Sequence, residues 1–559
     1  MSKERHLSFA QAEYAGKMKP PARLHSKARW TGLINGSGSC AEQARQRRDS
    51  LLQSIANNEL SPRLGRKDPH VSKDKQSKDT FAICHKLRLE DQHQAVSRAT
   101  MRFLVCILAL CPLLSAFAKP NVLLIMADDL RDFGGAFTKE VVKTPNLDRL
   151  RARGTTFERA YVQYPVCNPS RSSMMAGLRA EQTGIVGNDI PLRQKMPEVV
   201  TLPQLCKDAG WQSHAYGKLY HLGGGKNAEA KQRWMDAGSS WQTAQAFEAT
   251  KAGRKMLEGR DVTGGALKWC QWGAADGTDD DQPDGQIAAA TVAMIEKLGD
   301  TPWFIGCGFM KPHDPFIAPK KYFDLYPPDS LKPWNDPADM TPVRKDSVGF
   351  GDYGTAFGKF TEQERRELFR AYCAGTSFMD AQLGRVLDAL DKGKLWEKTI
   401  VVFVGDHGYH TGERQWWNKN TLFERSCRAP LIIAAPGLKG GQSTRSLAEF
   451  VDVYPTVADF CGLKMPHTAA GASLRPILTD PAKSIKDAAF TLVTRGDKLH
   501  GQSIRTARWR FTRWSDGPTE LYDHETDPEE LHDVSAQHAD VIADLTARIQ
   551  KLPPLVAKP

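Results

Sequence analysis

Two short, almost entirely apolar runs in this chain end abruptly in charged residues, and this feature most restricts the folds open to it. The run NVLLIMA ends in Asp128 and Asp129, and the run IVVFV leads, after a glycine, into Asp406 and His407. Apolar runs of this length are typical of strands buried on both faces of a sheet. In open α/β sheets, ligands bind outside the carboxyl ends of such strands.

These four side chains predict a metal site. Carboxylates gathered at one sheet edge repel each other unless a positive charge lies between them. A hard divalent cation such as Ca²⁺ prefers oxygen ligands and is the expected occupant, although the imidazole of His407 is a softer ligand. Either motif alone is weak evidence, because Asp-Asp after a strand is often a helix cap or a turn.

Strand-like and helix-like segments alternate along most of the chain. Thr144 and Pro145 predict a helix capped by the threonine and ended by Gly154. The alternation predicts an α/β domain, residues 119–480, with a mainly parallel central sheet flanked by helices. Further expected strands are 211–216, 303–309 and 431–435, and further expected helices are 361–390 (one long helix or a pair) and 454–460.

The end of the chain has a different pattern. Short strand-like runs separated by polar turns predict a smaller C-terminal α+β subdomain, residues 481–559, built on an antiparallel sheet. Its tripeptide Arg495-Gly496-Asp497 is interpreted as a β-turn and not as an adhesion signal. The expected elements are strands at 489–494, 501–506, 509–514 and 520–522 and a helix at about 537–551.

The sequence around Cys167 predicts an anion-binding helix start. Cys167 is followed by Asn-Pro-Ser and Arg171, and Gly177 comes six residues after the arginine. Pro169 suits the first turn of a helix, whose free N–H groups and positive dipole end attract anions. The guanidinium of Arg171 is suited to an oxyanion or a geminal diol. The alternative interpretation is a buried structural cysteine.

Cationic side chains follow other expected strands. Lys218 and His221 come after one strand, His313 after a second, and Lys419 lies in the segment that follows Asp406. A single lysine or histidine in a loop is usually only solvated. Three such loops at the edge that also carries the carboxylates predict a site for an anionic ligand.

The motif at Cys167, with these strand ends, resembles that of the type I sulfatases. The resemblance implies an alkaline-phosphatase-like large domain and a Ca²⁺ site. It implies that a formylglycine-generating or maturase enzyme oxidises Cys167 to formylglycine, whose hydrated aldehyde attacks sulfate esters. The implied metal ligands are Asp128, Asp129, the modified Cys167, Asp406 and His407, where many sulfatases carry Asn at the last position.

The spacings Gly-Lys-x-x-His, Lys-Pro-His-x-Pro-Phe and Gly-Glu…Trp-x-Lys look most like the iduronate-2-sulfatase branch. By that resemblance, Lys218, His221, His313 and Lys419 bind the sulfate oxygens, and His313 or Lys419 protonates the leaving alkoxide. The implied substrate is a sulfated carbohydrate, such as a uronic acid or polysaccharide. The resemblance spans about residues 121–534, but the segment between His221 and Trp303 departs from the pattern, where substrate-selecting loops often vary.

Two other functions remain open at this point. Related folds share the metal site with phosphonate and phosphodiester hydrolases, and some of these share the formylglycine. The chain would instead be a non-catalytic glycan-binding protein if Cys167 stays a thiol.

Charge and cysteine content bear on partners and location. The net charge is +11, but residues 1–100 carry most of it, so the chain from Lys119 onward is nearly neutral and nucleic-acid binding is not indicated. Residues 101–118 have the basic start, apolar centre and Ala-x-Ala end of a signal peptide. We therefore expect export to the periplasm or medium, without stable membrane insertion after cleavage.

That signal begins 100 residues into the chain, which indicates that translation starts at Met101. Residues 1–100 are then a spurious or disordered leader, because they are polar, basic and poor in aromatics. The alternative is a cytosolic protein with an internal apolar helix. Beyond Lys119 and apart from Cys167, six cysteines remain and permit up to three disulfides.

Overall fold

The computed structural model describes residues 119–555 except 224–227 and 350–352. The leader and signal peptide expected at 1–100 and 101–118 lie outside the described residues. All described residues belong to one compact unit, Leu110–Pro559.

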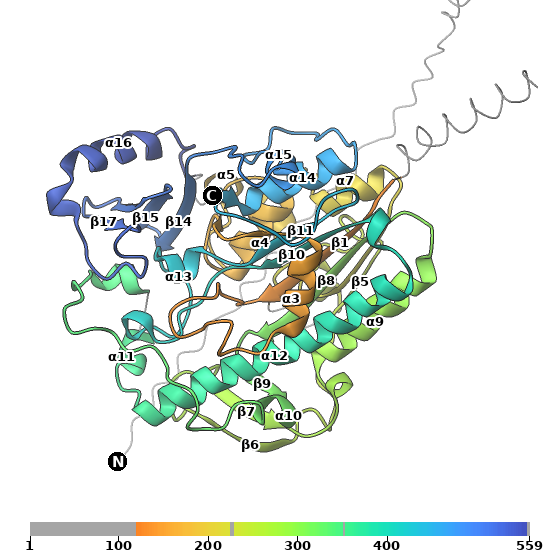
Figure 1. The fold of residues 1–559 in the computed structure, drawn as a ribbon, viewed down its shortest axis with the longest axis horizontal. Coiled ribbons are helices and arrows are strands. Elements are labelled where there is room, and N and C mark those ends of the chain that lie inside the picture. Colours follow the sequence, from red (N-terminus) through yellow and green to blue (C-terminus); the bar gives the residue numbers. More distant parts are fainter. Residues whose placement is uncertain (1–118, 224–227, 350–352, 556–559) are drawn as a thin grey trace, which may run out of the picture. The chain divides into compact units, whose positions relative to one another are not determined.

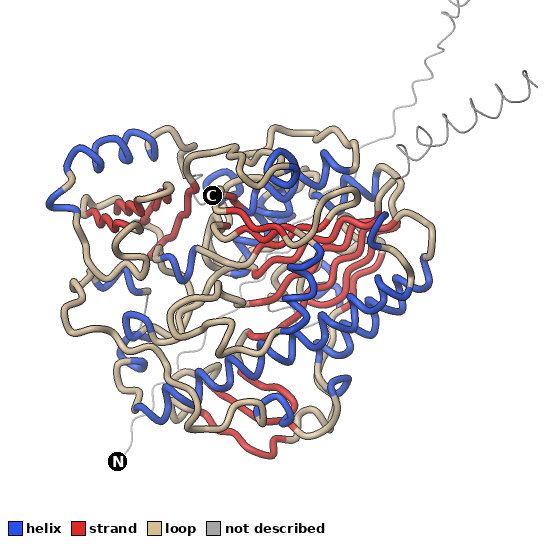
Figure 2. Tube along the Cα trace, in the orientation of Figure 1, coloured by secondary structure: helices blue, strands red, loops and turns tan. Residues whose placement is uncertain are grey.

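An eight-stranded sheet forms the centre of the described part of the chain (Figures 1 and 2). Its central strands β10, β1, β8 and β4 are parallel neighbours, so their carboxyl ends reach the same edge. Only β11 runs antiparallel to both of its neighbours, which confirms a mainly parallel sheet. In sheet order the strands are β12 (Gln442–Thr444), β2 (Thr155–Phe157), β11 (Leu431–Ala434), β10 (Thr399–Gly405), β1 (Asn121–Asp128), β8 (Trp303–Pro312), β4 (Gln212–Gly217) and β5 (Thr243–Gln245).

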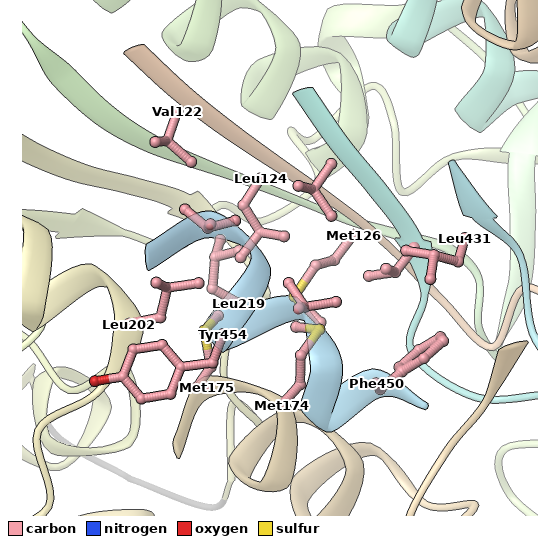
Figure 3. Packing of buried hydrophobic residues seen from close by; sticks show 14 of the residues in the cluster. Val122, Leu124, Met126, Met174, Met175, Leu202, Leu219, Leu431, Phe450 and Tyr454 are labelled. Carbon is pink, nitrogen blue, oxygen red and sulfur yellow. The ribbon is translucent and has the colours of Figure 1, made fainter. Parts of the chain in front are cut away.

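The first face of the sheet is covered by α4 (Cys167–Ala176), α7 (Leu202–Asp208), α14 (Val453–Phe460) and α15 (Arg475–Thr479). Alternate residues of β1, such as Leu124 and Met126, pack there against Met174 and Tyr454 (Figure 3). Period-two alternation along a strand produces this division of side chains between faces. The cluster fixes α4, which begins at Cys167, against the centre of the sheet.

The opposite face is covered by α3 (Pro145–Arg153), α9 (Pro283–Leu298) and α12 (Glu362–Lys392) (Figure 1). Leu123 and Ile125 of β1 pack there with residues of all three helices. The segment expected as one helix or a pair is a single helix of 31 residues. Its Thr361 accepts a hydrogen bond from the Glu364 N–H and completes a capping box.

The expected capping role of Thr144 is wrong, because its side chain makes no capping hydrogen bond to α3. Asp380 of α12 takes this role instead. Its carboxylate accepts hydrogen bonds from the backbone N–H groups of Asn146 (2.9 Å) and Leu147 (2.7 Å). A carboxylate from a distant helix therefore satisfies the free N–H groups at the start of α3 and joins the two helices.

The C-terminal antiparallel sheet is present, with strands in the order β14–β15–β16–β17, and α16 (Ala539–Ile549) packs on it. The expected turn at Arg495 joins β14 to β15, and Gly496 takes a φ of 65° there. The strands are β14 (Ala489–Arg495), β15 (Leu499–Arg505), β16 (Trp509–Trp514) and β17 (Thr519–Asp523).

A buried ion network joins this sheet to α13 (Glu424–Cys427) of the large domain. The carboxylate of Glu424 pairs with Arg505 (3.3 Å) and with Arg510, and Glu530 accepts from Arg510 (2.5 Å) and lies 2.8 Å from His524. Burial by itself would raise the pKa of Glu530, but Arg510 and His524 lower it to about 2. The subdomain is thereby fixed to the large domain by fully buried charges.

The remaining elements surround the central sheet. A three-stranded sheet contains β6 (Met256–Asp261), β7 (Gln271–Ala275) and β9 (Phe316–Pro319), and a two-stranded sheet contains β3 (Ala160–Tyr161) and β13 (Ala448–Glu449). The short helices are α5 (Ala180–Thr183), α6 (Leu192–Lys195), α8 (Ala228–Trp234), α10 (Lys320–Phe323) and α11 (Tyr353–Phe357).

All seven cysteines of the described residues are free thiols, so none of the three disulfides that the sequence permits is present among them. Among the helices of the described residues, none is long and apolar enough to cross a membrane.

Candidate active site

The predicted site residues meet at the carboxyl-terminal edge of the central sheet. Asp128 is the last residue of β1 and Asp129 follows it, Lys218 follows β4, and Asp406 and His407 follow β10. Asp129 has a φ of 62°, a left-handed conformation that non-glycine residues seldom adopt. Its backbone N–H donates to the Asp406 carboxylate over 2.9 Å, which joins the ends of β1 and β10.

Cys167 is fully buried at the first position of α4 and is surrounded by cationic groups. Its Sγ lies 3.3 Å from Lys419 Nζ, 3.5 Å from His407 Nε2 and 3.7 Å from Lys218 Nζ. Burial by itself would raise the pKa of the thiol, but the two lysines lower it well below its ordinary value. The site therefore stabilises negative charge at position 167.

The two lysines also neutralise the carboxylates beside Cys167. Lys218 Nζ donates to Asp128 and Lys419 Nζ donates to Asp129. Burial by itself would raise the pKa of Asp128, as does Cys167, but Lys218 and other nearby cations hold it below its usual range. Each lysine thus contacts both a carboxylate and the position where the sequence predicts the nucleophile.

Arg171 lies in α4, as the sequence predicts, and connects the ends of three strands. Its Nε donates to Asp406 over 2.8 Å, one terminal nitrogen donates to Asp128 over 3.1 Å, and the other donates to the Lys218 carbonyl. These contacts fix a fully buried guanidinium and align the two carboxylates. A role of Arg171 toward an oxyanion or diol at position 167 stays a prediction.

His407 is held with one ring nitrogen facing the cluster. Its Nδ1 lies 2.9 Å from the Gly408 carbonyl, which favours a proton on Nδ1 and leaves Nε2 as the lone-pair donor. Nε2 lies 3.3 Å from Asp129 Oδ1 and 3.6 Å from Asp406 Oδ1. Burial raises the pKa of Asp406 to about 6, and the negative charges of Asp128 and Cys167 act in the same direction.

These residues fit a divalent cation. One ligand atom each from Asp128, Asp129, Cys167 and His407 lies within 4.8 Å of the others. Asp129 Oδ2 is buried and accepts no hydrogen bond from the described residues. An orphaned carboxylate oxygen in a set of hard donors suits Ca²⁺, with a single imidazole as the softer member. Asp406 adjoins this group through His407 and Arg171.

His221 and His313 line a pocket of about 530 Å³ together with Lys419. His313 Nε2 is 4.0 Å from the nearest carboxylate oxygens of Asp128 and Asp129. Burial would lower its pKa, but Asp314 and Asp129 raise it to about 9. Three of the four predicted cationic residues therefore line one cavity. The fourth, Lys218, lies beside Cys167, which adjoins the cavity through its contact with Lys419.

The pocket also contains residues that sequence reasoning did not identify. Asp314 has a local signal, since it follows His313 directly, whereas the aromatic and amide residues have none. Arg495 was interpreted only as part of a turn. The acidic segment 278–285 contributes no residue to the pocket; its Asp284 instead accepts hydrogen bonds from the end of β8. The additional lining residues include Asn188, Trp269, Asp314, Tyr353, Asn418, Asn420 and Arg495.

Comparisons with known proteins agree with this geometry. The sulfatase family model matches residues 120–463, and the model of the C-terminal region of N-sulphoglucosamine sulphohydrolase matches residues 412–554. A sulfatase of Formosa agariphila is 33% identical over 427 residues, covering 74% of this chain and 82% of that protein. Human iduronate 2-sulfatase is 29% identical over 391 residues, covering 62% and 70%.

Solved structures show the same fold at lower identity. A phosphonate monoester hydrolase from Silicibacter pomeroyi has a TM-score of 0.65 at 22% identity, covering 78% of this chain and 95% of that one. A structure in complex with its substrate D-glucosamine-2-N,6-O-disulfate has a TM-score of 0.59 at 20% identity, covering 78% and 97%. The chain belongs to the sulfatase family, and it is a sulfuric ester hydrolase with the alkaline-phosphatase-like fold.

Proposed function

We propose that this protein is an exported sulfatase that removes sulfate esters from a carbohydrate through a formylglycine at position 167. The observation that carries the proposal is the set of groups around Cys167, with Lys218, Lys419 and His407 within 3.7 Å of its sulfur. A sulfate ester is an anion, and Lys419, which also lines the pocket, joins this cluster to the cavity. Export rests on the signal-like residues 101–118.

The proposed reaction begins with the hydrated aldehyde at position 167. One of its hydroxyl groups gives its proton to a neighbouring carboxylate, and its oxygen attacks sulfur in line with the ester oxygen as the sulfur–oxygen bond to the sugar breaks. The leaving alkoxide takes a proton from His313 or Lys419, which both face the pocket. The second hydroxyl then gives its proton to the residue that protonated the alkoxide, as the carbon–oxygen bond breaks and sulfate leaves with the bonding pair. This restores the aldehyde, which takes up water to form the hydrate again.

The remaining residues bind and orient. Lys218 holds a sulfate oxygen beside Asp128, His221 contacts the sulfate from the side of the pocket, and Arg171 keeps the carboxylates aligned. A divalent cation, for which we propose Ca²⁺, would be held by Asp128, Asp129, His407 and an oxygen at position 167, with Asp406 adjoining. When bound it supplies positive charge that polarises the sulfate.

The pocket wall supports a sugar as the substrate. Trp269 and Tyr353 lie in an edge-to-face arrangement with ring centroids 5.6 Å apart, and both line the pocket. Aromatic faces at a site that also carries cations suit a pyranose ring with anionic substituents. The relatives named iduronate 2-sulfatase also support a sugar substrate, as does the similar structure bound to a glucosamine disulfate.

The test is the mass of the tryptic peptide that contains Cys167, combined with turnover. Conversion of cysteine to formylglycine lowers the peptide mass by about 18 Da, and the purified protein should release sulfate from a sugar sulfate. A Cys167→Ala variant is the matched control. An unmodified thiol in an active enzyme would contradict the formylglycine mechanism, and an unmodified thiol in an inactive protein that binds glycans would favour the non-catalytic alternative.

The second candidate function is hydrolysis of phosphonate or phosphate esters, which the fold shared with phosphonate monoester hydrolases favours. Matched aryl sulfate and aryl phosphonate esters separate the two. We expect kcat/KM for the sulfate to exceed that for the phosphonate. The reverse order would replace the sulfatase proposal.

A further inference from the structure

Arg495 reaches the active-site pocket from the C-terminal subdomain. It is the last residue of β14, at the turn into β15, and it lines the same cavity as His313 and Lys419. One terminal nitrogen donates over 2.8 Å to the carbonyl of Asn420. Asn420 directly follows Lys419, whose Nζ is 3.3 Å from Cys167 Sγ, so the guanidinium is held against the segment that carries a cationic residue of the site.

The hydrogen-bond partners of Arg495 are all neutral. Besides Asn420, its nitrogens donate to the carbonyls of Asp346 (2.9 Å) and Thr494 (3.1 Å). The carboxylate of Asp346 pairs instead with Arg344 over 2.8 Å. Within the described residues, Arg495 forms no ion pair. Backbone carbonyls therefore fix the direction of the guanidinium without neutralising its charge.

Other arginines of this subdomain behave differently. Arg505 and Arg510 are buried, and both pair with the carboxylate of Glu424. A mostly buried cation without a carboxylate partner is costly, and such groups are usually paired with a protein group or a ligand. Burial lowers the pKa of Arg495 to about 10, although Tyr164 and Asp346 act in the opposite direction.

We propose that Arg495 binds a second anionic group of the substrate, a carboxylate or a second sulfate, beside the sulfate ester that is hydrolysed. This proposal rests on the proposed function, since it assigns the substrate class of the same pocket. A guanidinium presents its N–H groups in a planar fork that matches carboxylate and sulfate oxygens. The substrate class is then a sugar sulfate with at least two anionic groups. The second of these groups is bound by a residue outside the catalytic domain.

The experiment compares substrates that differ by one charge. The first pair is a uronic acid 2-sulfate glycoside and its carboxyl methyl ester, which keeps the sulfate but loses the carboxylate charge. The second pair is a neutral sugar that carries either two sulfates or one. The variants are Arg495→Gln and the conservative Arg495→Lys. Lys498→Ala is the matched control, because Lys498 is an exposed cation of the same turn that does not line the pocket.

We expect Arg495→Gln to reduce the preference for the dianionic member of one pair, measured as the ratio of kcat/KM values, by about 10- to 100-fold, the range for hydrogen bonds to charged groups. Arg495→Lys should restore part of that ratio, and Lys498→Ala should leave it unchanged. The substrate pair whose kcat/KM ratio changes shows whether Arg495 binds the uronate carboxylate or the second sulfate. Equal losses on both members of each pair, or no loss, would overturn the proposal.

A binding measurement keeps this inference separate from the proposed function. Calorimetry with the Cys167→Ala variant measures affinity for the same glycosides without turnover. Weaker binding of the dianionic glycoside after Arg495→Gln in that background supports the subsite even if the protein hydrolyses no sulfate ester. Unchanged affinity there, with normal hydrolysis by the unaltered enzyme, refutes the subsite and leaves the sulfatase function in place.

Discussion

Replacing His313 and Lys419 in turn should show which of them donates the proton to the leaving group. The structure separates their positions. Lys419 Nζ is 3.3 Å from Cys167 Sγ and pairs with Asp129, so it lies where the nucleophile and sulfate oxygens gather. The His313 side chain is 22% exposed and lies farther out, 4.0 Å from the nearest carboxylate oxygens. We therefore expect His313 to be the acid.

The magnitude follows from the chemistry of the leaving group. A positioned general acid contributes about 10²–10⁴-fold to rate, and this contribution matters for a sugar alkoxide but little for a nitrophenolate, which leaves unaided. His313→Ala should thus lower kcat/KM on a sugar sulfate by about 10²–10⁴-fold and on an aryl sulfate by less than about tenfold. Lys419→Ala should lower both by a similar factor, because it removes charge beside the sulfate itself.

The assay is steady-state release of sulfate and nitrophenolate by each variant, with thermal unfolding to establish that the variants fold. The ratio of the losses on the two substrates is the decisive quantity. If His313→Ala loses the same factor on both substrates, His313 only binds sulfate. If Lys419→Ala alone shows the dependence on leaving group, the two assignments must be exchanged.

Other perturbations test the nucleophile, the metal site, export and the ion network. Cys167→Ser should abolish sulfate release while leaving the unfolding midpoint unchanged, because a cysteine-directed maturase cannot oxidise serine; full activity would contradict the formylglycine assignment. Asp406→Ala should lose both activity and bound metal by elemental analysis, and unchanged activity would argue against the site. A chain that starts at Met101 should be exported to the same extent as the full-length chain, which N-terminal sequencing of the mature protein can establish. Export of the full-length chain alone would contradict a translation start at Met101. Glu530→Gln should cost about 3 kcal/mol at pH 7 in urea unfolding, because its pKa falls from 4.5 to about 2 on folding; the lowered folded pKa means that this stability is present above about pH 4.5 and is lost as the pH falls towards 2, whereas the exposed control Glu525→Gln should cost less than about 0.5 kcal/mol.

The sequence predicted the centre of the fold and the floor of the site well, for a physical reason. Strands buried on both faces have unmistakable apolar runs, and parallel strands bring their carboxyl ends to one edge. Asp128, Lys218 and His407, which are distant in sequence, could therefore be expected together. Cys167 was recognisable because its motif opens a helix next to that edge.

The walls of the pocket could not be predicted in this way. Trp269 and Arg495 reach the pocket from the edge of a small sheet and from a hairpin of the C-terminal subdomain, and no local pattern connects either with Cys167. The cap of α3 was missed for the same reason, because Asp380 lies more than 230 residues away in the sequence. Contacts of this kind depend on how helices and strands pack against each other. Hydrophobic periodicity and motif spacing in the sequence describe only single elements.

The order of strands in the central sheet also determines when, during translation, the region around Cys167 can fold. β1 is translated early but pairs with β8 and β10, which leave the ribosome some 180 and 280 residues later. Cys167 is completely enclosed once those strands and Lys419 are in place. If Cys167 is oxidised as proposed, the oxidising enzyme has to reach it while the chain is still incomplete or unfolded, before those strands enclose it.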